Sequence, residues 1–238
     1  METFDLNQTA RLAELFELPR ERRDDAWREN FFAAVPNASL ATFDPQVMTG
    51  PDGYPYFQLA IPDPGEFTPF SIVHLLEDIL RNGVGVVIFP SMRRDGNPAW
   101  VFSYGEMVSY SMFQNFQGDP QEQARKRPPP PPEGKTLARD TTFLRANPSE
   151  QYLPKHLRAV LGQFVRGQFQ HPDPRIGLVS SPVLSPPTSL MVNIRLRDCQ
   201  GNEQQLRWAM DRLLWFLPRT YSIMPLPDDW SDNEMAPL

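Results

Sequence analysis

The sequence predicts an α+β protein made of two small units, the second of which is ferredoxin-like. Its 238 residues are enough for two domains of about 100 to 150 residues each. Helical and strand-like hydrophobic periodicities alternate along the chain on both sides of one aperiodic stretch. That stretch, 121–135, contains the five consecutive prolines Pro128 to Pro132. Because successive prolines hold an extended polyproline II conformation, we interpret it as a semi-rigid spacer between the units.

The first unit, 1–120, is predicted to start with two amphipathic helices and to continue as strand, helix, strand, strand and helix. The two helical faces are formed by Leu12, Leu15 and Phe16 and by Trp27, Phe31, Ala34 and Val35. A strand is expected in YPYFQLAIP, and TPFSIVHLLEDILRNG is expected to be a helix with Thr68 as N-cap and Gly83 as its stop. VGVVIFP and AWVFSY are strands joined by an Asp95-Gly96 turn, and EMVSYSMFQNFQ is the closing helix.

The second unit, 136–227, follows the order strand, helix, strand, strand, helix, strand. These elements are predicted in TTFL, LPKHLRAVLGQFVRG, RIGLVSSPVL, SLMVNIRLRD, NEQQLRWAMDRLLWFLP and TYSIMPLP. Asn202, with Gln205 three residues later, is a capping-box-like start for the second helix. The order is that of a split βαβ unit, in which two helices cover one face of an antiparallel sheet.

The segment SLMVNIRLRD has the clearest alternation in the protein. One face is formed by Leu190, Val192, Ile194 and Leu196, and the other by Met191, Asn193, Arg195 and Arg197. The second face lacks helices in a ferredoxin-like unit, so we expect the first unit or a second molecule, in an isologous dimer, to cover it. Met191, Arg195 and Arg197 are therefore candidate partner-binding residues. A solvated face with the arginines in water is the alternative.

The last residues, 228–238, form an acidic tail. It carries four acidic residues and no Lys or Arg, and Trp230 is its one large aromatic residue. Docking of Trp230 on a partner and folding of Trp230 back onto its own unit both remain open. Trp230 is the fourth candidate partner-binding residue.

Composition and charge narrow the classes of partner. The net charge is −6, and the only compact basic cluster is Arg125-Lys126-Arg127, which argues against nucleic-acid binding. The single cysteine, Cys199, excludes an internal disulfide and a cysteine-based zinc site within one chain, as expected for a reducing compartment. No segment approaches the roughly 20 apolar residues of a membrane span, and the start lacks a signal peptide. We expect a cytoplasmic protein without a membrane partner.

The residues that could carry chemistry are scattered. Gly83-Val84-Gly85 follows a helix instead of a strand, so it is not a dinucleotide-binding loop, and we predict no cofactor. The three histidines lie far apart, which argues against a metal site. No catalytic residue is assigned. If the protein is an enzyme, the best acid–base candidates are His74 with Glu77 and Tyr104 with Glu106.

The course of the second unit resembles a known family. LRANPSEQYLPKHLRAVLGQFV, RIGLVSSPVL, SLMVNIRLRD and EQQLRWAMDRLLWFLPRTYSIMPLP are similar in order and pattern to the C-terminal domain of the enhanced-serine-sensitivity (SseB) proteins. PYFQLAIP and GVGVVIFP resemble strands of the family's N-terminal domain more loosely. The resemblance implies a bacterial cytosolic accessory protein and carries no catalytic residue or cofactor with it.

These observations favour a non-catalytic accessory or regulatory protein that acts through protein–protein interaction, with a homodimer as one arrangement. Two other classes stay open. One is an enzyme of small-molecule, for example amino-acid, metabolism. The other is an inhibitor or immunity-type protein that uses its acidic balance to meet a basic surface.

Overall fold

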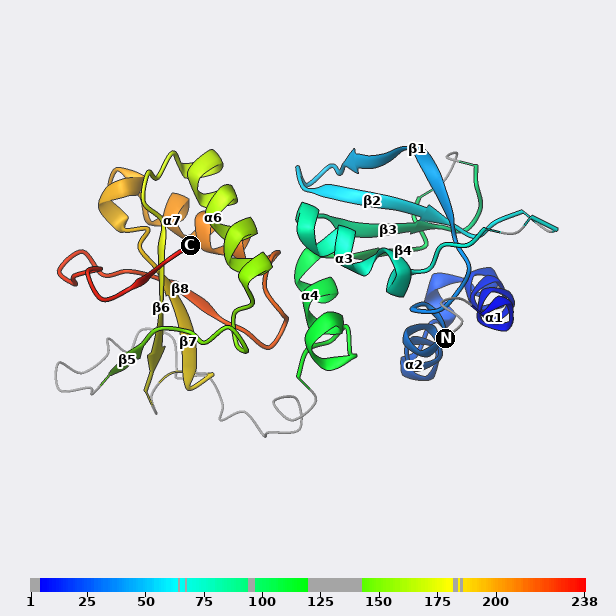
Figure 1. Ribbon diagram of the computed structural model, residues 1–238, viewed down its shortest axis with the longest axis horizontal. Coiled ribbons are helices and arrows are strands. Elements are labelled where there is room, and N and C mark those ends of the chain that lie inside the picture. Colours follow the sequence, from blue (N-terminus) through cyan, green and yellow to red (C-terminus); the bar gives the residue numbers. More distant parts are fainter. Residues whose placement is uncertain are drawn as a thin grey trace. The chain divides into compact units, whose positions relative to one another are not determined.

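The computed structural model describes residues 5–63, 65–66, 68–93, 97–119, 143–181, 184 and 186–238. Contacts divide the chain into two compact units, unit 1 (Met1–Phe116) and unit 2 (Gln117–Leu238). Each unit contains helices and a sheet, which confirms the α+β class (Figure 1). The spacer expected at 121–135 and the expected Asp95-Gly96 turn lie outside the described residues.

Unit 1 is built on a four-stranded mixed sheet. Its strands are β1 (Ala41–Thr49), β2 (Pro55–Ala60), β3 (Gly85–Phe89) and β4 (Trp100–Phe102), in that spatial order. The pair β2–β3 is parallel and the other two pairs are antiparallel. Helix α3 (Ile72–Asn82) makes the crossover that a parallel pair requires.

Two helices at the start of unit 1 close its core with aromatic side chains. These are α1 (Leu6–Glu17) and α2 (Asp25–Ala34), both predicted, with the short helix η1 (Arg20–Arg22) between them. Phe31 of α2 is fully buried, and its ring lies 4.7 Å from Trp100 and 5.9 Å from Phe102 of β4. Helix α4 (Tyr104–Phe113) follows β4 with a capping box from Ser103 and Glu106.

Two local expectations for unit 1 are corrected. Strand β1 was not predicted, because Asp44, Pro45 and Gln46 interrupt its alternation; the strand accommodates them at a register shift between Thr42 and Val47. The N-cap of α3 is Ser71, whose hydroxyl accepts a hydrogen bond from His74 N, and not Thr68. Gly83 ends the helix as predicted, in the left-handed conformation at φ 67°.

Unit 2 contains a second mixed sheet. Its strands are β5 (Leu144–Ala146), β6 (Arg175–Ser180), β7 (Thr188–Val192), β8 (Ile223–Pro225) and β9 (Ala236–Pro237). The order is β5-β6-β7-β8, and β9 also pairs with β6. Helix α6 (Lys155–Phe169) joins β5 to β6, and the short helix η2 (Leu196–Cys199) and α7 (Glu203–Leu214) lie between β7 and β8.

The ferredoxin-like topology expected for unit 2 is not observed. In that topology the first strand lies inside the sheet, whereas β5 lies beside β6, and β7–β8 is a parallel pair. The predicted order of helices and strands is observed from β5 to β8, but that order does not determine which strands pair, and β9 lies in the segment expected to be a tail. All three residues of β5 are exposed, so this strand has no buried side chains with which to occupy a central position.

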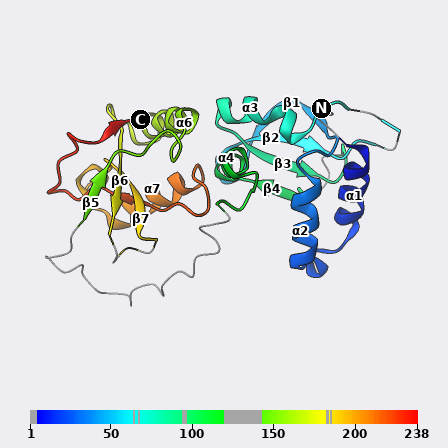
Figure 2. The same ribbon diagram turned by 60° about the horizontal axis from the view of Figure 1, so that its bottom comes forward.

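The two faces of the unit 2 sheet are covered differently. In Figures 1 and 2, α6 and α7 lie on one side of the sheet and the last part of the chain lies on the other. The second side has a small core of its own, in which Val179, Met191, Leu226 and Met235 are buried together. This side holds the residues that were expected to face a partner.

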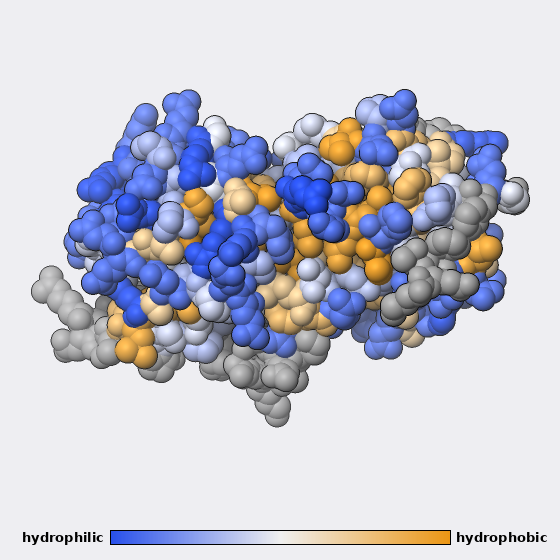
Figure 3. Space-filling model, viewed as in Figure 1, coloured by the Kyte–Doolittle hydropathy of each residue, from blue (hydrophilic) through white to orange (hydrophobic). Residues whose placement is uncertain are grey.

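Figure 3 shows hydrophilic side chains over most of the visible surface of unit 2 and larger apolar groups on unit 1. The described residues include some large apolar side chains that are well exposed, namely Leu6, Val47, Val73, Val101, Leu144, Trp208 and Leu214. None of the helices described is both long and apolar enough to span a bilayer.

Candidate functional site

The candidate site is the sheet face of unit 2 together with the segment that covers it, residues 226–238, which we name the carboxyl-terminal segment. The segment begins after β8, where Leu226 N donates to Val192 O at 2.9 Å and to Ile194 O at 3.1 Å. It then crosses the face and ends as β9, antiparallel to β6. Leu238 N donates to Pro174 O, and Arg166 Nη2 donates to Leu238 O at 2.8 Å.

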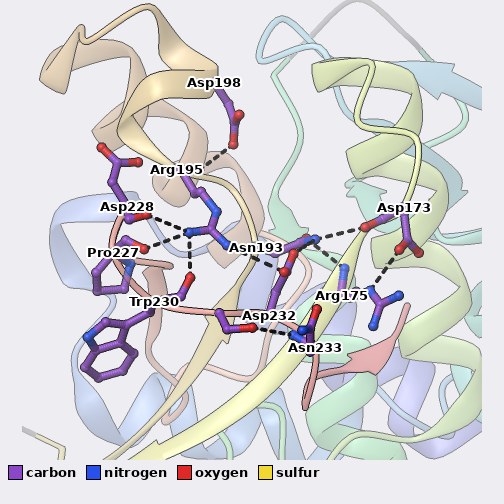
Figure 4. Close-up of polar contacts among 11 residues, drawn as sticks. Asp173, Arg175, Asn193, Arg195, Asp198, Pro227, Asp228, Trp230, Asp232 and Asn233 are labelled. Atoms are coloured by element: carbon purple, nitrogen blue, oxygen red, sulfur yellow. Dashed lines mark hydrogen bonds and ion pairs between the residues drawn. The ribbon is translucent and has the colours of Figure 1, made fainter.

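Arg195 is the main polar anchor of this segment. Its side chain is almost completely buried, and Nη1 donates to the carbonyl oxygens of Pro227, Asp228 and Trp230 at 3.0, 3.2 and 2.7 Å. Nη2 lies 3.6 Å from a carboxylate oxygen of Asp232 (Figure 4). Because three of these contacts are to main-chain carbonyls, the binding of Arg195 to the segment depends more on the backbone path of the segment than on its side chains.

Asn193 is a second buried anchor in the same row. Its Nδ2 donates to Asp173 O at 2.9 Å and to Asp232 Oδ2 at 3.2 Å, and its Oδ1 accepts from Arg175 N at 2.7 Å (Figure 4). The hydrogen bond from Asn193 is the largest cause that lowers the pKa of Asp232; the charges of Arg195 and Arg175 add to it, and partial burial opposes it. Asp232 is therefore held as a carboxylate.

Trp230 supplies the aromatic contact. The guanidinium of Arg145 on β5 lies 3.7 Å from the centroid of its ring, a distance typical of a cation–π interaction. Phe143 meets the same ring edge-on at 5.6 Å. Trp230 thus folds back onto its own unit, which is one of the two alternatives that the sequence left open.

A cavity of about 230 Å³ adjoins this contact, where β5 ends and β9 begins. Arg145, Met191, Glu234 and Met235 are among the residues that line it. The carboxyl-terminal segment therefore covers its face incompletely, and it leaves a hollow with one cationic and one anionic side chain at its rim.

The four candidate partner-binding residues have different environments. Met191 and Arg195 are buried beneath the carboxyl-terminal segment, and Trp230 is partly exposed within it. Arg197 is exposed but leaves the row, because β7 ends at Val192 and η2 follows, so SLMVNIRLRD is not one continuous strand. The face is covered by the chain's own carboxyl-terminal segment, which contacts both its apolar and its polar side chains.

Three residues that complete the site were not singled out from the sequence: Arg145, Asn193 as a hydrogen-bonding group, and Asp232. The sequence contains one usable signal, namely four acidic residues in a tail and arginines on the strands. Only the fold shows which arginine meets which part of the tail.

Three of the four acid–base candidates of the enzyme hypothesis make structural contacts, and the fourth, His74, is exposed on α3. Tyr104 donates its hydroxyl to Leu80 O at 3.0 Å, and burial raises the pKa of Tyr104. Glu106 belongs to the capping box of α4, and Glu77 pairs with Arg81 on the surface of α3. Within the described ranges, no three His, Cys, Asp or Glu side chains gather as a metal would require.

Comparison with protein-family models, with curated proteins and with solved structures found no match for this chain.

Proposed function

We propose that this protein is a non-catalytic accessory protein that binds another protein, and that the covered sheet face of unit 2 is its binding groove. The proposal includes the kinship with the SseB family and the bacterial cytoplasmic setting that the sequence resemblance implies. In this view the carboxyl-terminal segment occupies the groove in cis, in the place of a partner.

The single observation that carries the proposal is the contact of Arg195 with three main-chain carbonyl groups of one four-residue stretch, those of Pro227, Asp228 and Trp230. Main-chain contacts provide affinity for an extended segment without dictating its sequence, as in other modes of strand recognition. The pairing of β9 with the edge of β6 adds the same kind of contact. A segment from another protein with a similar path can make all of these hydrogen bonds.

The charges of the groove and of the segment that lies in it indicate the chemistry of the partner. The groove presents Arg145, Arg175 and Arg195, and the segment that lies in it carries Asp228, Asp229, Asp232 and Glu234. We therefore expect the partner to offer an acidic, extended segment with an aromatic residue for Arg145.

The test uses a labelled peptide with the sequence of residues 226–238 and measures its binding by fluorescence anisotropy. In the full-length chain the added peptide must compete with the chain's own carboxyl-terminal segment, whose effective concentration is in the millimolar range. We expect weak binding to the native chain and clearly tighter binding to a chain with Trp230→Ala and Asp232→Ala, in which the competing segment is loosened.

The matched control adds Arg145→Ala to the loosened chain. Because Arg145 is exposed and its guanidinium contacts the ring of Trp230, this variant should fold and bind the peptide less tightly. Absence of binding to the loosened chain, with its fold intact by circular dichroism, would contradict the groove.

A further inference from the structure

A second cavity lies on the helical side of unit 2. It has a volume of about 280 Å³ and is formed where α6 ends, η2 turns and α7 begins. Ile194 lines it, whereas its chain neighbours Asn193 and Arg195 contact the carboxyl-terminal segment. The cavity is therefore separate from the groove of the proposed function.

Two aromatic side chains form its wall. Trp208 of α7 is 47% exposed, and its ring meets that of Phe169 of α6 edge-on at 6.3 Å. Arg212 lies on the ring of Trp208, 5.0 Å from its centroid, and helps to hold the ring in place. A tryptophan that stays this exposed beside a hollow is a common feature of binding sites.

His171 contributes a polar side chain to the wall of the cavity. Nδ1 of His171 is shielded from solvent and has no hydrogen-bond partner within the described part of the chain. His171 lines the cavity together with Ile194 and Trp208. A buried polar atom left unpaired costs folding free energy, so a ligand gains affinity if the imidazole turns toward the cavity and Nδ1 pairs with it.

Cys199 lines the same cavity but is poorly suited to act as a nucleophile. Burial, and then the charge of neighbouring Asp198, raise the pKa of the thiol. At neutral pH Cys199 is therefore almost entirely protonated. The chemistry of the cavity favours reversible binding over covalent catalysis.

We propose that this cavity binds a small aromatic molecule of one or two rings that carries an N–H or O–H donor, such as an indole or a phenol. The ring lies against Trp208 and Phe169 above Ile194, and the donor pairs with Nδ1 of His171 once the imidazole turns toward the cavity. The volume supports a ligand of this size, because it falls just below the roughly 300–1,000 Å³ typical of pockets for drug-sized ligands. The inference goes beyond the proposed function and does not depend on it.

The only cysteine of the chain provides a built-in reporter. Cys199 in the native full-length protein is alkylated with iodoacetamide at about pH 8, where a thiol of raised pKa still reacts slowly, and the rate is measured by mass spectrometry. We expect indole to slow alkylation several-fold and in a saturable manner. Alkylation that indole leaves unchanged up to its solubility limit would overturn the proposal.

Benzofuran tests the hydrogen bond, because it has the shape of indole but lacks the N–H donor. We expect indole to bind about fivefold more tightly than benzofuran, and His171→Ala to remove that difference. Equal protection of Cys199 by the two compounds in the native protein would overturn the assignment of His171 as the acceptor.

Two substitutions on α7 locate the site. Trp208→Ala removes the cavity wall and should abolish protection by indole. Because Trp208 is exposed, we expect the variant to fold, and circular dichroism checks this. Leu214→Ala is the control, because Leu214 is similarly exposed, at 41%, and does not line the cavity. Protection that survives Trp208→Ala would place the bound indole elsewhere and overturn the site.

Discussion

Unit 1 and unit 2 share a core topology that their sequences do not suggest. In each unit a helix precedes an antiparallel hairpin, and a second helix crosses over to a strand parallel to the hairpin's second strand. The two series are α2-β1-β2-α3-β3 and α6-β6-β7-α7-β8. The units differ in the parts added to this core, which include α1, β4 and α4 in unit 1 and β5 with the carboxyl-terminal segment in unit 2.

The added parts close the two sheets with different chemistry. In unit 1 the additional strand meets an aromatic cluster around Phe31, and the guanidinium of Arg23 lies on one of its rings, 4.8 Å from the centroid of Trp27. In unit 2 the face is closed by Arg195, Asn193 and Asp232 around a smaller apolar cluster. The largely aromatic cover of unit 1 is part of its core, whereas our proposed function requires that the polar cover of unit 2 can be replaced by another segment.

The largest effect is expected in unit 1. Phe31→Ala removes a fully buried ring and should lower the free energy of unfolding by about 3–5 kcal/mol. Hydrogen exchange measured peptide by peptide should show the loss of protection in unit 1. Leu6→Ala, at a residue 56% exposed, is the control and should change little. An equal loss throughout unit 2 would show that the two units unfold together.

Arg195→Met is expected to have the next largest effect. It leaves the carbonyls of Pro227, Asp228 and Trp230 without their shared donor and should destabilise unit 2 by about 3 kcal/mol. Denaturant titration gives the free energy, and hydrogen exchange of residues 226–238 localises it. Arg197→Met changes an exposed arginine two positions away and should stay within about 0.5 kcal/mol of the native protein. Similar losses in both variants would rule out a special role for Arg195.

As the pH falls, the carboxyl-terminal segment of unit 2 should be released before the aromatic cluster around Phe31 in unit 1 is disturbed. The pKa of Asp232 is lower in the folded chain than its ordinary value of 3.8, so its contribution to stability is complete above 3.8. That contribution is lost as the pH falls from 3.8 through the lower folded value. Hydrogen exchange of the segment measures the release, and Asp232→Asn should flatten this pH dependence. An unchanged profile in that variant would assign the release to another carboxyl group.

The smallest effect is expected for Arg145→Ala. A partly exposed cation–π contact contributes about 0.5–1 kcal/mol, so the segment should loosen slightly around Trp230 without loss of the fold. The emission maximum of tryptophan fluorescence and local hydrogen exchange report the change. Leu144→Ala is a matched control at the neighbouring position of β5, 70% exposed. If both variants change the tryptophan emission and the local hydrogen exchange equally, the contact between Arg145 and Trp230 does not stabilise the segment.

Most of the local structure was predictable because it depends on neighbours in the chain. The hydrophobic periodicity of α2 and α6, the N-cap at Asn202 and the stop at Gly83 are short-range features, and each is observed where it was expected. Strand β1 was missed because its bulge carries polar residues and a proline. The break after Val192 was missed because alternation continues into η2, where the backbone no longer forms a strand.

The sequence by itself determined the α+β class, the order of elements in unit 2 and the amphipathic faces that require burial. Only the tertiary structure decided which strands pair and what covers the face of Met191, Asn193 and Arg195. The physical reason is that hydrophobic periodicity shows which face of a helix or strand must be buried, but it does not show which other part of the chain will cover that face. The carboxyl-terminal segment meets that face because Arg195 and Asn193, more than 30 residues away in the chain, supply the hydrogen bonds that an extended backbone lacks on its own.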